Sequence, residues 1–171
     1  LKFFSYFFTL LCLLIIVNAF NFIDGIDGLA SSLFIIPMFI LLLFSFLLQN
    51  VSNFQLIILF NVCLFFLINL KITPLKQIFL GDSGSTFLGL ILGCFLIYYS
   101  DRQIIDSLLV PWLVIIPIFD LTRVVISRAF NKKNPLYPDN IHIHHIFLKY
   151  FDSQKITLLI IVFLSILFSL L

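Results

Sequence analysis

The chain has 171 residues, of which 62% are hydrophobic and 11% are charged. Its mean hydropathy of +1.21 excludes a water-soluble domain, because such domains are only about half apolar. The net charge of +2 is small and dispersed, which excludes a nucleic-acid surface, where basic residues cluster in a patch or stripe. We therefore expect an all-α membrane protein, since open sheets cannot satisfy their backbone groups in lipid.

Apolar runs bounded by polar clusters predict about six transmembrane spans in a single domain over residues 1–171. In chain order the spans lie near residues 3–17, 29–48, 55–70, 84–100, 107–119 and 156–171. The three cysteines each lie within an apolar run, which favours packing roles over a disulfide framework. The chain begins with Leu1 and shows no convincing signal peptide, so we expect a truncated open reading frame.

Five polar segments separate these spans and alternate between the two sides of the bilayer. The first, third and fifth, near residues 18–28, 71–83 and 120–155, share one side. That side carries most of the basic residues: Lys71, Lys76, Arg123, Arg128, Lys132, Lys133, Lys149 and Lys155. The positive-inside rule predicts that it is cytoplasmic. Because most of the aspartates and all the histidines share this side, we expect function on the cytoplasmic face.

The first polar segment repeats polar side chains at every third position: Asn18, Asn21, Asp24 and Asp27. Side chains three residues apart share a helix face, so this set can bind a hydrated cation, a sugar or the edge of a base. Gly25 and Gly28 allow the backbone to approach a ligand closely. The alternative is an ordinary turn between two helices, since Asn, Asp and Gly are common turn residues.

The third polar segment ends in a glycine-flanked acidic motif, with Gly81 and Gly84 around Asp82 and Ser83. The start of the following helix offers free backbone N–H groups to a phosphate, and Asp82 can bind the divalent cation that accompanies it. The alternative is that Asp82 or Ser83 only caps the helix.

The fifth polar segment contains Arg123 and Arg128, whose guanidinium groups are suited to phosphate. The alternative is a positive-inside flank, which we favour for Lys132 and Lys133.

Three histidines, His142, His144 and His145, lie within four residues of one another. Such a cluster can donate to a diphosphate, shuttle protons or bind a soft metal. The absence of a neighbouring cysteine disfavours structural zinc.

Taken together, the motifs DGIDGLA, FLGDSGSTFLG and PDNIHIHH resemble the polyprenyl-phosphate N-acetylhexosamine-1-phosphate transferases, glycosyltransferase family 4. All three occur in the family's order and are separated by apolar spans. The motif HIHH, which follows Pro138 and Asp139, resembles the corresponding motif of the branch that transfers GlcNAc 1-phosphate to undecaprenyl phosphate.

The resemblance implies transfer of an N-acetylhexosamine 1-phosphate, most simply from UDP-GlcNAc, to polyprenyl (undecaprenyl) phosphate, with release of UMP and use of Mg²⁺. It implies a multi-pass protein of the bacterial cytoplasmic membrane that initiates a cell-wall or surface polysaccharide such as lipopolysaccharide. The catalytic set would be Asp24, Asp27, His144 and His145, and Asp82 would bind magnesium. The substrate-binding set would be Asn18, Asn21, Gly25, Arg123, Arg128, His142 and Phe79, with Phe79 stacking on uracil.

Two departures from the family pattern restrict what the resemblance implies. Family members carry an adjacent aspartate pair on an earlier cytoplasmic segment, and no Asp-Asp occurs in this chain. The resemblance therefore implies that the chain is the C-terminal portion of a longer enzyme. Asn140 and Lys132 stand where a basic residue and a turn glycine are often found. The exact sugar and the length of the lipid stay open. So does the mechanism, which can be one direct displacement or pass through a covalent intermediate. The oligomeric state is also open, with a homodimer as one candidate.

Two other classes of function compete with this interpretation. A transporter or channel would use Asp24, Asp27 and Asp82 as an ion path, and its acids should lie near the middle of the bilayer. A catalytically inactive fragment would only fold or associate.

Overall fold

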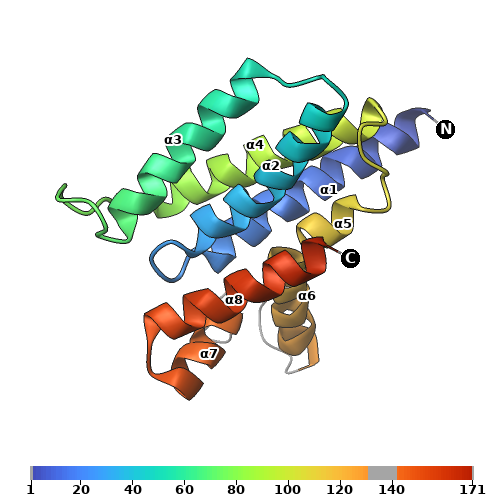
Figure 1. Ribbon diagram of the computed structural model, residues 1–171. Helices are drawn as coiled ribbons and strands as arrows, with labels where there is room; N and C mark the ends of the chain where they lie inside the picture. The colour runs from blue at the N-terminus through green and yellow to red at the C-terminus, as the bar shows by residue number, and fades with distance from the viewer. Residues whose placement is uncertain (1, 131–141, 171) are drawn as a thin grey trace.

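The computed structural model describes residues 2–130 and 142–170, with the backbone alone for residue 2. These residues form helices and no strand, which confirms the all-α prediction. The helices in chain order are α1 Lys2–Ile23, α2 Leu29–Leu47, α3 Asn53–Asn69, α4 Gly81–Asp101, α5 Val110–Leu113, α6 Ile115–Phe130, α7 Ile143–Phe151 and α8 Gln154–Ser169 (Figure 1). The predicted features at Lys132, Lys133, Pro138, Asp139 and Asn140 lie outside the described residues.

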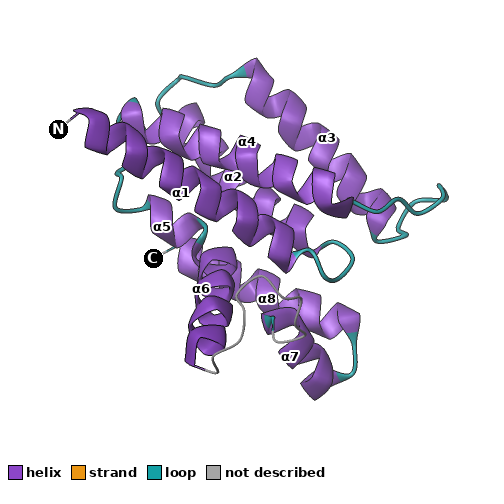
Figure 2. Ribbon diagram, turned by 180° about the vertical axis from the view of Figure 1, so that it is seen from behind, coloured by secondary structure: helices purple, strands orange, loops and turns teal. Residues whose placement is uncertain are grey.

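Helices α1, α2 and α4 run side by side at the centre of the bundle, with α3 on the outside of α2 and α8 along its other side (Figures 1 and 2). Helices α6 and α7 extend from one side of this group (Figure 2). The core is apolar and is richest on α2, where Leu33, Phe34, Met38 and Leu41 are fully buried. Burial of these side chains between helices orders α2 against its neighbours.

The contact between α1 and α4 is close because small residues recur at every fourth position of α4: Ser85, Gly89 and Gly93. A Cβ atom at Gly89 would lie 2.9 Å from the Cα of Val17, and one at Gly93 would lie 2.5 Å from Leu13 Cδ1. Such spacing lets two helix backbones approach each other within a membrane. The order of the contacts makes the helices antiparallel, so the end of α1 meets the start of α4.

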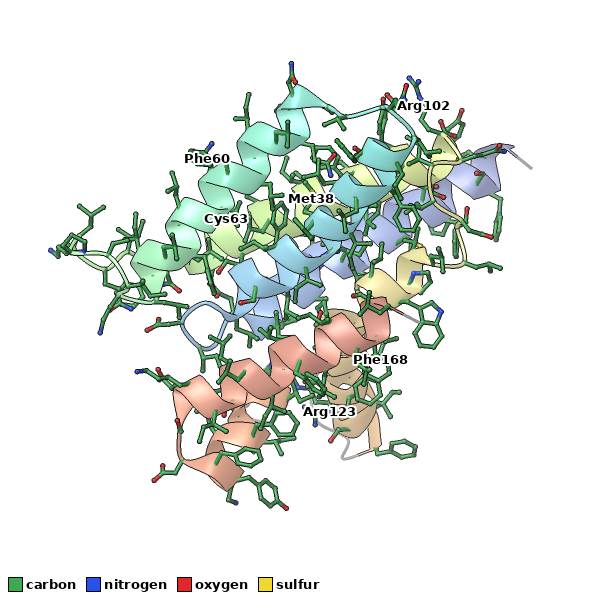
Figure 3. All side chains as sticks on the ribbon, in the orientation of Figure 1. Met38, Phe60, Cys63, Arg102, Arg123 and Phe168 are labelled. Carbon is green, nitrogen blue, oxygen red and sulfur yellow. The ribbon has the colours of Figure 1, made fainter. Side chains whose placement is uncertain are left out.

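Among the residues that the structure describes, three helices are long and apolar enough to cross a membrane: Phe3–Ile23, Leu29–Leu47 and Gly81–Asp101. Two more, Asn53–Asn69 and Gln154–Ser169, are apolar but shorter. The chain is therefore a membrane protein. Its outer surface agrees with this conclusion, since large apolar side chains such as Phe60 on α3 are exposed (Figure 3).

The first predicted span is too short, because α1 continues beyond residue 17 to Ile23. Asn18 and Asn21 therefore lie within the helix.

The predicted span near residues 107–119 is not one helix. Helix α5 ends at Leu113 and α6 begins at Ile115. Pro117 explains the break, since it has no N–H to donate to the carbonyl of Leu113 and its ring crowds that carbonyl. Helix α6 then runs on to Phe130 and carries Asp120 and Arg123 within its length.

Gly89→Ala is expected to lower the melting temperature of the detergent-solubilised protein by several degrees. The new methyl group meets backbone atoms of α1, and such overpacking costs about 1–3 kcal/mol. Gly93→Ala is the matched control on the same helix, because its methyl group meets only the end of the Leu13 side chain, which can move. Equal melting temperatures for the two variants would contradict the close packing of α1 on α4.

Candidate active site

Three carboxylates from two distant segments line one pocket of about 330 Å³. The turn after α1 contributes Asp24 and Asp27, the segment that leads into α4 contributes Phe79, and the first turn of α4 contributes Asp82. The complete lining consists of Asp24, Gly25, Ile26, Asp27, Asn69, Phe79, Leu80, Gly81 and Asp82. The structure thus brings together the first and third polar segments of the sequence.

The turn after α1 changes the geometry expected for the first polar segment. Because α1 ends at Ile23 and the Gly25 N–H bonds to the Ile23 carbonyl at 2.8 Å, Asp24 and Asp27 lie in a turn. The prediction that they share a helix face with Asn18 and Asn21 is therefore wrong. Gly28 completes the turn with a φ of 81°, a conformation that costs glycine little and side-chain-bearing residues more.

Asn69, at the end of α3, ties the two segments together. Its Oδ1 accepts a hydrogen bond from the Gly28 N–H at 2.5 Å, and its Nδ2 donates to the Ile78 carbonyl at 2.8 Å. Gln77 adds a second tie, since its Nε2 donates to Asp27 Oδ2 at 2.8 Å and to the Asn69 carbonyl at 3.0 Å. These bonds hold the acidic turn against the segment that carries Phe79.

The two asparagines of α1 have different surroundings. Asn21 Oδ1 accepts a hydrogen bond from Ser85 Oγ at 2.9 Å, which joins α1 to α4 beside the pocket. Asn18 is exposed, and its Nδ2 donates to the Leu14 carbonyl at 2.7 Å. Neither lines the pocket, and Asn18 lies one turn further from it than Asn21.

Asp82 lies exposed in the first turn of α4, where the partial positive charge of the helix start favours a carboxylate. The simple capping alternative does not describe this helix start, because the N-terminus of α4 has no side-chain cap bond. Phe79 is 73% exposed, so the face of its ring is accessible to a planar ligand.

The carboxylates influence one another across the pocket. Burial, followed by the charges of Asp82 and Asp27, raises the pKa of the Asp24 carboxyl to about 6. Carboxylate and amide oxygens are the donors that Mg²⁺ prefers, and Mg²⁺ is usually bound by one or two carboxylates together with substrate phosphates. The pocket residues therefore fit magnesium, although no three His, Cys, Asp or Glu side chains within residues 2–130 and 142–170 converge as a ligand cluster.

The histidines lie at the start of α7, beside the acidic turn. His142 is buried, and its ring stacks on Phe22 of α1 at 5.7 Å between centroids. Its Nδ1 lies 2.8 Å from Asp120 Oδ2. His145 is partly buried, with its ring 4.1 Å from that of His144. Because the described side chains form no metal-ligand cluster, the soft-metal alternative gains no support.

His144 is the histidine that contacts the acidic turn directly. It is 1% exposed, and a Cβ atom on Gly25 would lie 1.9 Å from its Nε2. Burial, followed by the charges of His145 and His142, lowers the pKa of His144 to about 4. Both ring nitrogens are buried and have no hydrogen-bond partner among the described residues. The imidazole is therefore neutral near pH 7 and packs against Gly25, the residue after Asp24.

The two arginines lie on α6, and neither is among the residues that line the pocket. Arg123 Nη2 donates to Asp120 Oδ1 at 2.9 Å, and Arg128 is buried. Figure 3 shows Arg123 well away from Arg102, the basic residue at the other end of the bundle. The binding of phosphate by Arg123 and Arg128 stays a prediction.

Four residues of this region were not among the predicted site residues: Asn69, Gln77, Ser85 and Asp120. Ser85 was detectable, because it begins the small-residue repeat of α4. Asn69 and Gln77 each act through contacts with the acidic turn, roughly 40 and 50 residues away in sequence. No local spacing predicts such contacts.

Comparison with known sequences now gives the family. The profile of glycosyl transferase family 4 matches residues 1–100. The chain belongs to glycosyl transferase family 4. The resemblance found in the three sequence motifs is thereby confirmed.

Similar proteins occur in several bacteria. An undecaprenyl-phosphate alpha-N-acetylglucosaminyl 1-phosphate transferase of Thermotoga maritima is 34% identical, over 91% of this chain and 47% of its own length. A "probable undecaprenyl-phosphate N-acetylglucosaminyl 1-phosphate transferase" of Bacillus subtilis is 33% identical, over 96% of this chain and 46% of its own length. A decaprenyl-phosphate N-acetylglucosaminephosphotransferase of Mycolicibacterium smegmatis is 32% identical, over 90% and 43%. The chain thus spans about half the length of the curated relatives it matches.

Asp24→Asn is expected to stabilise the Mg²⁺-free protein near pH 8. Because the folded-state pKa of Asp24 is raised from 3.8 to about 6, folding favours its protonated form, and stability falls as the pH rises from about 4 to 6. Above that range the ionised carboxylate costs about 1–2 kcal/mol after discounting for solvent screening. Thermal unfolding in detergent with EDTA should show a gain of a few degrees near pH 8 that shrinks near pH 5.

The control for that measurement is Asp101→Asn, at the exposed far end of α4, which should change little. A gain for Asp24→Asn that is independent of pH, or no gain at all, would contradict the charge crowding in the pocket.

Proposed function

We propose that the complete protein transfers GlcNAc 1-phosphate from UDP-GlcNAc to a polyprenyl phosphate such as undecaprenyl phosphate and releases UMP. In this proposal residues 1–171 act as one membrane-embedded catalytic domain of the bacterial inner membrane. The pocket faces the cytoplasm, and the product initiates a cell-wall or surface polysaccharide. The names of the relatives support the lipid phosphate and the GlcNAc 1-phosphate group.

The observation that carries the proposal is the convergence of Asp24, Asp27 and Asp82 on one pocket, with exposed Phe79 on its wall. An acidic pocket suits a nucleotide diphosphate only when a divalent cation accompanies it. The aromatic ring offers a stacking surface for a base. A pocket at the ends of spans is accessible both to a soluble nucleotide sugar and to the phosphate of a membrane lipid.

The transfer forms a bond between an oxygen of the lipid phosphate and the sugar-bearing phosphorus, and it breaks the bond from that phosphorus to UMP. Asp82, with the neighbouring carboxylates, would hold Mg²⁺, which supplies neutralisation of the phosphate charges when bound. Asn21 and Gly25 would position the nucleotide sugar. Neutral His144, with His145 beside it, would bond to phosphate oxygens or accept a proton, and such positioning is the main protein contribution to phosphoryl transfer.

The transport alternative expects acids near the middle of the bilayer. Asp24 and Asp27 instead follow the last residue of α1, and Asp82 lies in the first turn of α4. These positions at the ends of spans favour a site open to the aqueous phase. No observation within the described residues favours a path across the membrane.

The test is release of UMP from UDP-GlcNAc by membranes that contain the complete protein, with undecaprenyl phosphate and Mg²⁺. Asp82→Asn keeps the shape of the side chain and removes its charge, so we expect a loss of at least about 100-fold, the order of effect for loss of one strong electrostatic contact. Asp101→Asn, at the other end of the same helix, should retain full activity.

Release that requires the lipid, Mg²⁺ and Asp82 would support the transferase. A folded complete protein that releases no UMP from UDP-GlcNAc or other UDP-N-acetylhexosamines would contradict it, and so would full activity of Asp82→Asn.

A further inference from the structure

Asp120 is a buried carboxylate that the transferase proposal does not use. Its side chain is 1% exposed, and it lies on α6. A buried charge is costly unless it is paired and hydrogen-bonded. Asp120 meets that requirement with three donors, two of which come from a segment more than twenty residues later in the chain.

The three donors surround both carboxylate oxygens. Oδ1 accepts from the Ile143 backbone N–H at 2.7 Å and from Arg123 Nη2 at 2.9 Å. Oδ2 lies 2.8 Å from His142 Nδ1. Because a carboxylate only accepts, this contact requires the proton on Nδ1. Asp120 therefore fixes the position of His142 and also determines that Nδ1 carries a proton.

Asp120 also substitutes for a missing helix cap. Helix α7 begins at Ile143 after His142, and no side chain of its own caps it. The first N–H groups of a helix need acceptors, and a negative charge is favourable at that end. The bond from the Ile143 N–H to Asp120 supplies both, so the start of α7 is fixed to α6.

The position of α7 determines where His144 lies. His144 is the second residue of α7, its ring is parallel to that of His142 within 5°, and it packs directly on Gly25. A shift of the helix start would move this ring away from the Asp24–Gly25 turn. A chain of contacts thus leads from Asp120 through His142 and Ile143 to the acidic pocket.

We propose that Asp120 is a positioning residue of the transferase: it fixes the tautomer of His142 and the start of α7, and so keeps His144 against Gly25. The inference rests on the proposed function. Asp120 acts through the histidines and contacts no reacting atom. Removal of a carboxylate that orients a metal-bound histidine typically costs about 10- to 100-fold in activity, and we expect a loss of the same order here.

Asp120→Asn in the complete protein separates positioning from simple stability. The amide oxygen can still accept from the Ile143 N–H, but its NH₂ group then faces His142 Nδ1 and favours the opposite tautomer. We expect kcat to fall about 10- to 100-fold with KM for UDP-GlcNAc nearly unchanged and the melting temperature close to that of the parent. Asp101→Asn on α4 is the matched control and should leave kcat intact.

A double-mutant cycle tests whether the effect passes through His142. His142→Phe removes Nδ1 and retains the stacking on Phe22. If Asp120 acts through His142, Asp120→Asn should cost less than about threefold in kcat in the His142→Phe background, because contacting residues show coupled effects. Multiplicative losses in the double variant would overturn the proposal.

Nitrogen NMR of isotope-labelled histidine in the unmodified protein gives a readout that needs neither a variant nor activity. A protonated His142 Nδ1 is expected, and a bare Nδ1 would overturn the proposal even if the transferase activity is real. If the complete protein is inactive but Nδ1 is protonated, the proposed transferase function is contradicted, whereas the contact of Asp120 with His142 is supported. Full kcat in Asp120→Asn would also overturn the positioning role.

Discussion

The antiparallel contact of α1 with α4 is the constraint on which the candidate site depends. Ser85, Gly89 and Gly93 allow the two backbones to approach closely. The same face ends in the hydrogen bond from Ser85 to Asn21, two positions separated by 64 residues in sequence. Because the helices are antiparallel, the turn that follows α1 meets the first turn of α4, and the aspartates of both segments line one pocket.

Two groups with opposite electrostatic preferences meet at this end of the bundle. The carboxylates of the pocket crowd one another, so that Asp24 has a raised pKa. On the other side of Gly25, burial and neighbouring histidines hold His144 neutral. Neither arrangement favours stability, since a crowded carboxylate and a buried imidazole without a partner both cost free energy. Such groups are typical of functional sites, where a ligand supplies the missing interaction.

Composition and apolar runs were enough to predict an all-α membrane protein, because a lipid environment leaves helices as the usual solution. The polar motifs were enough to name Asp24, Asp27, Asp82 and Phe79, which the structure brings to one pocket. The detailed geometry of the first motif was not predictable from spacing, since α1 stops at Ile23 and the aspartates follow in a turn. The sequence does contain the reason why the fifth predicted span is broken, namely Pro117.

Contacts between distant segments could not be predicted from the sequence. Asn69 is one asparagine at the end of an apolar helix, and only the fold shows that it bonds to Gly28. Asp120 lies three residues before Arg123, a predicted phosphate-binding residue, yet two of its three partners, His142 and Ile143, lie at the start of α7. Roles of this kind follow from the packing of α1, α4, α6 and α7, which short-range patterns do not specify.

A disulfide cross-link between α1 and α4 tests the central contact most directly. Asn21→Cys and Ser85→Cys would be introduced together after Cys12, Cys63 and Cys94 have been replaced, since all three are free thiols. Mild oxidation of the complete protein in membranes should join the pair rapidly. The control variant contains Asn21→Cys and retains Cys94 as its only native cysteine. Cys94 follows Gly93 at the other end of the contact between α1 and α4, so this pair should not cross-link. Failure of the first pair to cross-link, or equal cross-linking of both pairs, would contradict the arrangement that brings the acidic segments together.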